Sequence, residues 1–181
     1  MRALLIYRDD GPIAERLGRL QHEVAPSWLA AFAVLPLAGA IIAGGPRTGI
    51  AAVVIAWMVL LGGLSRGGPL ESDRFAWAVP ALLRAGEYAA LIWLSPVGSL
   101  PVLIALAFRH YDNVYGLRYR GVAPQWPTGG WDGRLLLAWL LLVIGALPAG
   151  FYVLGGILGA LFVAECVTSW RDHNPQGDTA P

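Results

Sequence analysis

The sequence predicts an all-α integral membrane protein, a bundle of six transmembrane helices with an amphipathic surface helix at its N-terminus. Hydrophobic residues make up 56% of the 181 residues and charged residues only 14%, whereas soluble domains carry about 25% charged residues. Six apolar runs are candidates for membrane spans, each of which needs about 20 residues. All 13 basic residues are arginines, and most lie on one side of these runs. These observations disfavour an ordinary soluble domain and exclude intrinsic disorder.

The six apolar runs define the predicted helices in order. They cover residues 27–43, 48–64, 75–94, 97–115, 134–147 and 149–170. The last two runs are separated only by the region around Pro148, so the turn between them is tight. Five spans with one re-entrant hairpin are the main alternative.

The arginines predict the orientation, because cytoplasmic loops of membrane proteins are rich in basic residues. With six spans and a cytoplasmic N-terminus, the outer loops contain only Arg47, and Arg84 and Arg109 lie within spans. The inner segments contain the other ten: Arg2, Arg8, Arg16, Arg19, Arg66, Arg74, Arg118, Arg120, Arg134 and Arg171. This bias predicts an inner-membrane protein with both termini cytoplasmic. Five tryptophans near predicted span ends fit interfacial positions: Trp28, Trp77, Trp93, Trp131 and Trp170.

The N-terminal 26 residues form a different kind of segment. Asp10-Gly11-Pro12 is typical of a helix start, and Ile13, Leu17, Leu20 and Val24 then recur at helical spacing. This pattern predicts an amphipathic helix on the inner membrane surface, with a short helix packed on the bundle as an equal alternative. The predicted organisation is therefore an N-terminal interfacial helix (1–26), a six-span domain (27–170) and a flexible cytoplasmic tail (171–181).

Several predicted spans contain charged side chains, which are costly in a bilayer and usually face the bundle interior. Arg84 and Glu87 lie three residues apart, on one face of the third span. In the predicted topology, the charged residues in or next to spans three to six all lie in the cytoplasmic half of the membrane: Arg84, Glu87, Arg109, Asp112, Arg118, Asp132, Arg134 and Glu165. We therefore expect a polar pocket, open to the cytosol and built by these four spans.

These residue types indicate a phosphate-bearing ligand. Arginine forks bind phosphate, and the predicted phosphate ligands are Arg84, Arg109, Arg118 and Arg134. Carboxylates suit Mg²⁺ that is shared with substrate phosphates, and the predicted metal ligands are Glu87, Asp112 and Asp132. Acids and a histidine can move protons, and the predicted catalytic residues are Glu87, His110, Asp112 and Glu165.

Structural roles compete with each of these assignments. Arg84 and Glu87 could form an ion pair that joins helices, and Asp132 could cap the helix that begins at Gly133. Arg118 and Arg134 also satisfy the bias toward cytoplasmic arginines. Glu165 is the hardest to explain structurally, because no neighbour in its own span can neutralise it. Gly155 and Gly159 allow close helix packing, within the bundle or in a homodimer.

Other chemistries fit the sequence poorly. The net charge of +1 leaves no basic surplus for nucleic-acid binding. The single cysteine, Cys166, allows no intrachain disulfide. The three histidines are scattered, which disfavours a zinc site, and no serine has an evident histidine and acid partner.

Five polar strings are characteristic of this sequence: Arg84-Ala85-Gly86-Glu87-Tyr88, His110-Tyr111-Asp112, Gly121-Val122-Ala123-Pro124, Gly130-Trp131-Asp132-Gly133-Arg134 and Phe162-Val163-Ala164-Glu165. Together they resemble an actinobacterial membrane domain of unknown function, which occurs C-terminal to nucleotidyltransferase and CDP-alcohol phosphatidyltransferase domains. The opening Arg8-Asp9-Asp10-Gly11-Pro12 is also similar to the start of that domain. The resemblance covers nearly the whole chain and implies a setting in phospholipid or CDP-alcohol metabolism.

The resemblance does not extend to the transferase itself. That enzyme's signature, D-G-x-x-A-R followed by spaced aspartates, is one residue shorter than the segment from Asp10 to Arg16, and no D-x-x-x-D follows it here. The leading hypothesis is a membrane enzyme, a Mg²⁺-dependent transferase or lyase, or a lipid-binding domain, acting on a phosphate-bearing lipid or CDP-alcohol. The alternative is a non-catalytic accessory or oligomerisation domain of a CDP-alcohol phosphatidyltransferase or nucleotidyltransferase partner. A small transporter is the third hypothesis, although no internal repeat supports it.

Overall fold

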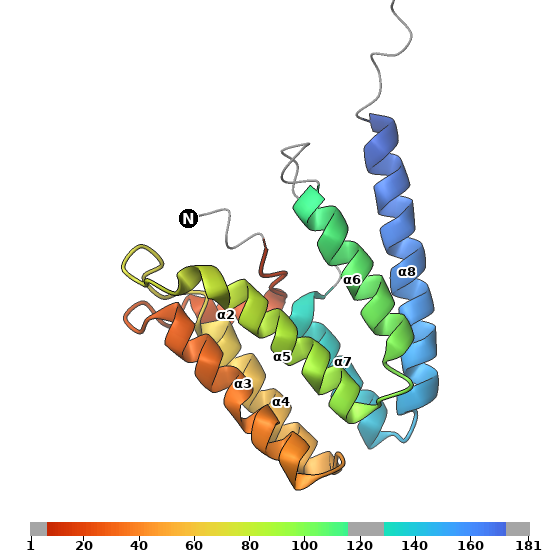
Figure 1. The fold of residues 1–181 in the computed structure, drawn as a ribbon, viewed down its shortest axis with the longest axis horizontal. Coiled ribbons are helices and arrows are strands. Elements are labelled where there is room, and N and C mark those ends of the chain that lie inside the picture. Colours follow the sequence, from red (N-terminus) through yellow and green to blue (C-terminus); the bar gives the residue numbers. More distant parts are fainter. Residues whose placement is uncertain (1–6, 116–128, 173–181) are drawn as a thin grey trace, which may run out of the picture.

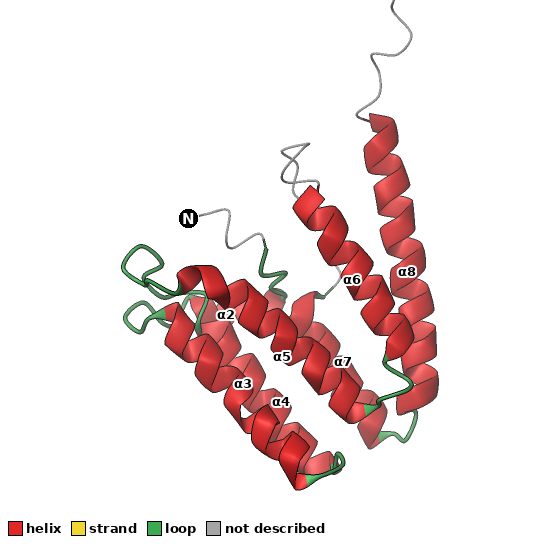
Figure 2. Cartoon of the chain, in the orientation of Figure 1, coloured by secondary structure: helices red, strands yellow, loops and turns green. Residues whose placement is uncertain are grey.

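The computed structural model describes residues 7–115 and 129–172. Within these ranges the chain forms seven α-helices and one short 3-10 helix, with no strands (Figure 1 and Figure 2). The helices are α2 (Pro12–Gly18), α3 (Pro26–Ala43), α4 (Thr48–Leu64), η1 (Ala76–Ala78), α5 (Val79–Leu94), α6 (Leu100–Tyr115), α7 (Gly130–Val143) and α8 (Leu147–Asp172). The all-α prediction is confirmed.

The helices pack as a main body and a separate pair, α6 and α8, which run in the same direction. In the body, α3 packs on α4 and α5, and α7 packs on α4 and α5. The short α2 lies against α4 and α7. The long α6 and α8 pack mainly on each other, and α8 also contacts α7 (Figure 1). The junction between body and pair is therefore a seam that is crossed by few helix–helix contacts.

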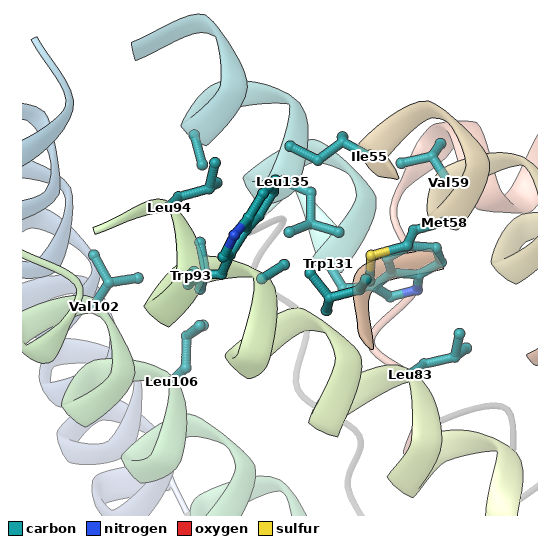
Figure 3. Close-up of a cluster of buried hydrophobic side chains, with 14 of the residues drawn as sticks. Ile55, Met58, Val59, Leu83, Trp93, Leu94, Val102, Leu106, Trp131 and Leu135 are labelled. Atoms are coloured by element: carbon teal, nitrogen blue, oxygen red, sulfur yellow. The ribbon is translucent and has the colours of Figure 1, made fainter. Parts of the chain in front are cut away.

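A continuous apolar core holds the body together (Figure 3). Ile55 and Met58 of α4, Leu83 of α5, and Trp131 and Leu135 of α7 are at most 2% exposed. Burial of such side chains stabilises the fold by about 1.5–3 kcal/mol each. Trp131 therefore belongs to the core.

Two helices are long and apolar enough to cross a membrane: α3, and residues 147–168 of α8. Only 28% of each apolar window is buried within the protein, whereas the core helix of a soluble protein would be mostly covered. The apolar α4 has 17 residues, and α7 has only 14, or about 21 Å against a hydrocarbon core of about 30 Å. By length and composition, then, two spans are supported in the described residues, and the six-span bundle is not established.

The short helices have local causes. The predicted third span, residues 75–94, is divided into η1 and α5, with a proline in the first turn of α5. The predicted fourth span begins at Leu100 instead of residue 97. The predicted fifth span begins four residues early, at Gly130, and ends at Val143 before Gly145, whose φ is +72°. A positive φ is natural for glycine and stops a helix.

The N-terminal helix is shorter than the predicted amphipathic helix, and it packs on α4 and α7. The structure ends α2 at Gly18, so Leu20 and Val24 lie outside it and are exposed. Ala14 and Gly18 are buried, and a Cβ on Gly18 would lie 2.8 Å from the Cβ of Arg66. The alternative, a short helix packed on the bundle, is the one that the structure shows.

The loop between α4 and α5 is fastened to α3 by Asp73, which gives a prediction about pH. The Asp73 carboxylate accepts hydrogen bonds from the Ser27 N–H (2.7 Å), the Ser27 hydroxyl (2.8 Å) and the Phe75 N–H (2.9 Å). Burial raises the pKa of Asp73, but these hydrogen bonds lower it further, so the pKa lies below its ordinary value of 3.8. Because the folded pKa is depressed, this stabilisation is present above the unfolded pKa and is lost as pH falls through the folded value. Asp73→Asn should flatten the acid limb of a plot of unfolding temperature against pH, and an unchanged limb would contradict this role.

The two glycines of the G-x-x-x-G motif in α8 have different surroundings. A Cβ on Gly155 would lie 2.6 Å from the Cβ of Pro101 and 2.7 Å from its carbonyl carbon, whereas nothing lies within 4 Å of a Cβ on Gly159. We therefore predict that Gly155→Ala destabilises the α6–α8 packing by about 1–3 kcal/mol. Gly159→Ala should be neutral or slightly stabilising, by up to about 1 kcal/mol. Thermal unfolding of both variants in one detergent tests the difference, and equal effects would contradict it.

Candidate functional site

One end of the fold gathers the charged side chains. The middle of α5, the second half of α6, the start of α7 and the second half of α8 all contribute to it, together with residues 7–10 from the N-terminus. We call this cluster the polar junction, and it consists of Asp9, Arg84, Glu87, Tyr88, Arg109, His110, Arg134 and Glu165. The sequence-based prediction of a shared polar region from α5 to α8 agrees with this placement.

Arg134 is the centre of the polar junction. Its Nε donates to Glu87 Oε1 at 2.6 Å and its Nη2 donates to Glu87 Oε2 at 3.1 Å, which ties α7 to α5. Its Nη2 also lies 2.8 Å from Asp9 Oδ2. Glu87 and Arg134 are almost fully buried, so each charge depends on the other for stabilisation.

Arg84 does not use Glu87 as its hydrogen-bonding partner, although the two lie three residues apart on α5. Arg84 Nη2 donates to the backbone carbonyl of Tyr7 at 2.8 Å. The suggested Arg84–Glu87 ion pair is replaced by contacts to other parts of the chain. In the part of the chain that the structure describes, this is the only hydrogen bond shown for the Arg84 guanidinium.

Tyr88 and His110 join α5 to α6 across the seam. Tyr88 Oη lies 2.7 Å from His110 Nδ1, and the two rings stack with centroids 5.8 Å apart. His110 Nε2 lies 4.0 Å from Asp9 Oδ2. The predicted catalytic histidine is therefore within the polar junction, held between a phenol and a carboxylate.

Arg109 neutralises Glu165 across the α6–α8 interface. Arg109 Nη1 pairs with Glu165 Oε2, and its guanidinium lies 5.0 Å from the centroid of the Phe162 ring. The charge of Glu165 is thus compensated by a neighbouring helix. Two buried atoms at this interface, Arg109 Nε and Asn113 Oδ1, have no hydrogen-bond partner among the described residues.

The three predicted magnesium ligands are not brought together. Glu87 binds Arg134, and Asp112 of α6 lies 3.7 Å from Cys166 Sγ of α8. Asp132 accepts hydrogen bonds from the backbone N–H groups of Gly11 (2.6 Å), Ile13 (3.0 Å) and Ala14 (3.1 Å). Within residues 7–115 and 129–172 no group of three acidic, histidine or cysteine side chains is arranged to hold a metal ion. Arg118, a predicted phosphate ligand, lies outside the described residues.

Asp132 has a structural function that differs from the predicted one. It lies in the first turn of α7, which begins at Gly130 and not at Gly133. Its carboxylate caps the N-terminus of α2, whose own N-cap residue, Gly11, has no side chain to do so. A carboxylate at that position is also favoured by the helix dipole. Asp132 therefore anchors the N-terminal segment onto α7.

The N-terminal charges were missed as structural residues by the sequence analysis. Arg8 donates to the carbonyls of Ser65 (3.1 Å) and Gly62 (2.9 Å) and so caps the end of α4. Asp10 accepts from Arg8, Arg66 and the Trp131 indole N–H. The available signal was a run of three charges, Arg8-Asp9-Asp10, directly before a Gly-Pro helix start.

Gly11 is required where this segment meets α7. A Cβ at position 11 would lie 2.1 Å from the carbonyl oxygen of Gly129 and 2.4 Å from Asp132 Oδ1. Gly129 and Gly130 in turn have φ of +75° and +66°, which favours glycine. The backbone of residues 9–11 can therefore lie directly on the start of α7.

A family model matches residues 1–179 of the chain and is described as a family of unknown function, DUF5941. The chain belongs to DUF5941. The match includes the N-terminal segment as well as every residue of the polar junction, so both are parts of one DUF5941 domain. No curated protein and no solved structure matches the chain. The identification of a domain of unknown function is confirmed, and DUF5941 membership assigns no reaction.

Proposed function

We propose that this chain is an inner-membrane domain with six spans and both termini in the cytoplasm, and that its polar junction binds a phosphate or diphosphate group. The ligand would be a phosphorylated lipid or a CDP-alcohol, bound at the cytoplasmic face of the membrane. Two observations support the membrane setting: the mostly exposed apolar surfaces of α3 and α8, and the concentration of arginines on one side of the apolar runs. The shorter helices would be accommodated by local thinning of the bilayer and by arginines at their ends.

The observation that carries the ligand proposal is the unused donor capacity of two arginines. A guanidinium has five N–H donors. In the described residues Arg84 donates one hydrogen bond, to a neutral carbonyl, and Arg109 Nε donates none. Phosphate oxygens accept such donors in paired, charge-assisted hydrogen bonds. Tyr88 and His110 lie beside them and add further polar groups.

The geometry supports binding more directly than turnover. Glu87, Glu165 and Asp132 are each occupied by an arginine or by backbone N–H groups, so none is free to act as a base without rearrangement. A transferase or lyase activity stays a prediction, with Glu87, His110, Asp112 and Glu165 as its residues. Mg²⁺ also stays a prediction, and it would have to bind largely through phosphate oxygens and water.

The same occupied carboxylates favour a second candidate function. A non-catalytic accessory domain needs its buried charges only for structure. Positions 156 and 159 of α8 are open, with nothing within 4 Å of an added Cβ, and they could contact a CDP-alcohol phosphatidyltransferase, a nucleotidyltransferase partner or a second copy of the chain. This candidate predicts that Gly159→Leu disrupts an assembly without changing monomer stability.

Thermal unfolding of the detergent-purified chain with CDP-diacylglycerol tests the leading proposal. A ligand at about 100 times its Kd that binds only the folded state stabilises it by about 2.7 kcal/mol. Wild type should show a raised unfolding temperature, and Arg84→Gln should lose most of that rise. Arg47→Gln is the matched control. Arg47 precedes the first residue of α4, at the end of that helix that is not capped by Arg8, and this variant should respond as wild type. Repetition with and without Mg²⁺ tests the metal, and no shift with CDP-diacylglycerol or phosphatidic acid would contradict the proposal.

A further inference from the structure

We propose that the Asp9 carboxylate occupies the phosphate subsite of the polar junction as an internal anion, which a phosphate-bearing ligand must displace. This inference rests on the proposed function and extends it, because it places the phosphate and names the residue that competes with it. Asp9 would then control access to the site.

The first support is the position of the Asp9 charge. Its Oδ2 lies 2.8 Å from Arg134 Nη2 and 4.0 Å from His110 Nε2. The same carboxylate also interacts electrostatically with Arg84 and Arg109. Carboxylate and phosphate oxygens are recognised by the same arginine geometry, so a carboxylate that lies among these arginines and is paired with one of them marks where a ligand phosphate would bind.

The second support is the backbone of Asp9. Its φ is +54°, and among the described residues it is the only non-glycine residue with positive φ. Aspartate tolerates this conformation better than most residues, but such positions are held by their surroundings and concentrate at functional sites. Two hydrogen bonds hold the backbone conformation of Asp9. The backbone N–H of Trp131 donates to the Asp9 carbonyl at 3.0 Å, and the Arg84 guanidinium donates to the Tyr7 carbonyl.

The third support is that Asp9 lies between two firm anchors. Arg8 is fixed to the end of α4, and Asp10 is fixed to Arg66 and Trp131. Compensating rotations about the backbone bonds on both sides of Asp9, which relax its positive φ, would swing its carboxylate out while both neighbouring side chains stay anchored. The Trp131–Asp9 hydrogen bond would break, and the Arg134 Nη2 group that pairs with the Asp9 carboxylate would be released for the phosphate.

Competition by Asp9 can be measured from ligand affinity. Two probes, CDP-diacylglycerol and inorganic pyrophosphate, would be titrated into the full chain in nanodiscs. If the displaced state is populated at about 10%, Asp9→Asn should bind about tenfold more tightly than wild type. Glu15→Gln removes the same charge from an exposed residue of α2 and should bind within about twofold of wild type. If Asp9→Asn binds only CDP-diacylglycerol more tightly than wild type, the ligand is a lipid-borne diphosphate. If it binds both probes more tightly, the site recognises the phosphate group itself.

Displacement has its own measurement, hydrogen exchange at the Trp131 amide. A saturating probe should raise the exchange rate of this amide in wild type, because its acceptor has left. A simple charge effect of Asp9→Asn would tighten binding and leave Trp131 exchange unchanged, which would overturn the inference. If Asp9→Asn fails to fold, hydrogen exchange of the Trp131 amide in wild type, with and without the probe, still tests whether Asp9 is displaced.

The failures of the two proposals are distinguishable. Binding by wild type that Asp9→Asn leaves unchanged or weakens would overturn the role of Asp9 and leave the proposed function standing. Absence of binding to wild type and to Asp9→Asn, with either probe, would overturn both. Loss of binding in Arg84→Gln, together with the gain in Asp9→Asn, would support both.

Discussion

Asp132→Ala is expected to lower the free energy of unfolding by about 3–5 kcal/mol, among the largest effects of any single substitution in the described chain. The variant removes the one acceptor of three backbone N–H groups, those of Gly11, Ile13 and Ala14. A buried donor left without a partner costs about 1–3 kcal/mol. The N-terminal segment should therefore detach from α7, which thermal unfolding and limited proteolysis near residue 11 both detect.

Asp132→Asn is the matched control for this substitution. It keeps one carbonyl oxygen as an acceptor but loses the negative charge at the start of α2, so its loss of stability should be clearly smaller. If Asp132 were instead a surface metal ligand, both variants would unfold as wild type does in the absence of metal. Equal unfolding temperatures for wild type and both variants would contradict the capping role.

Arg134→Met is expected to destabilise the fold by a similar amount, about 3–5 kcal/mol, because it leaves two carboxylates buried without their cation. These are Glu87, bound by two hydrogen bonds, and Asp9, 2.8 Å away. The measurement is chemical or thermal unfolding in detergent. Glu87→Gln alone should also destabilise, so loss of activity in that variant would not by itself identify a catalytic acid.

The double variant Glu87→Gln/Arg134→Met tests whether Glu87 and Arg134 stabilise the fold as an ion pair or contribute independently to the free energy of unfolding. Once Arg134 has gone, removing the Glu87 charge should recover part of the lost stability, so the two effects should not add. Glu15→Gln, which removes a partly exposed acid paired only with the end of Arg66, should cost less than about 1 kcal/mol. Strict additivity of the Glu87 and Arg134 substitutions would contradict the buried pair.

The helices that the sequence predicts best are those with uninterrupted apolar runs between clear stops. The predicted 48–64 helix coincides with α4, and the predicted 149–170 helix lies within α8. Prediction is poorer where the chain is polar and the helix is short. Residues 13–24 keep a helical apolar pattern, yet α2 ends at Gly18, where the chain packs closely on Arg66.

The end of the bundle that carries the charges could be predicted, but the pairing of those charges could not. Successive helices alternate in direction, so polar residues late in α6 and α8 and early in α5 and α7 must meet. Sequence proximity then favours Arg84 with Glu87, whereas the structure pairs Glu87 with Arg134 of α7 and Glu165 with Arg109 of α6. Asp9 was missed because a charged N-terminal segment normally indicates solvent exposure, whereas its side chain is only 15% exposed and pairs with Arg134.

The most direct test of the account is to locate a bound phosphate lipid on the protein. A CDP-diacylglycerol analogue with a photoreactive group beside its diphosphate would be crosslinked to the chain in nanodiscs, and the adducts mapped by mass spectrometry. We predict adducts within residues 84–88 and 109–113, suppressed by excess unlabelled CDP-diacylglycerol and lost in Arg84→Gln. Adducts confined to the outer faces of α3 and α8, and unaffected by the competitor, would contradict a phosphate-binding polar junction.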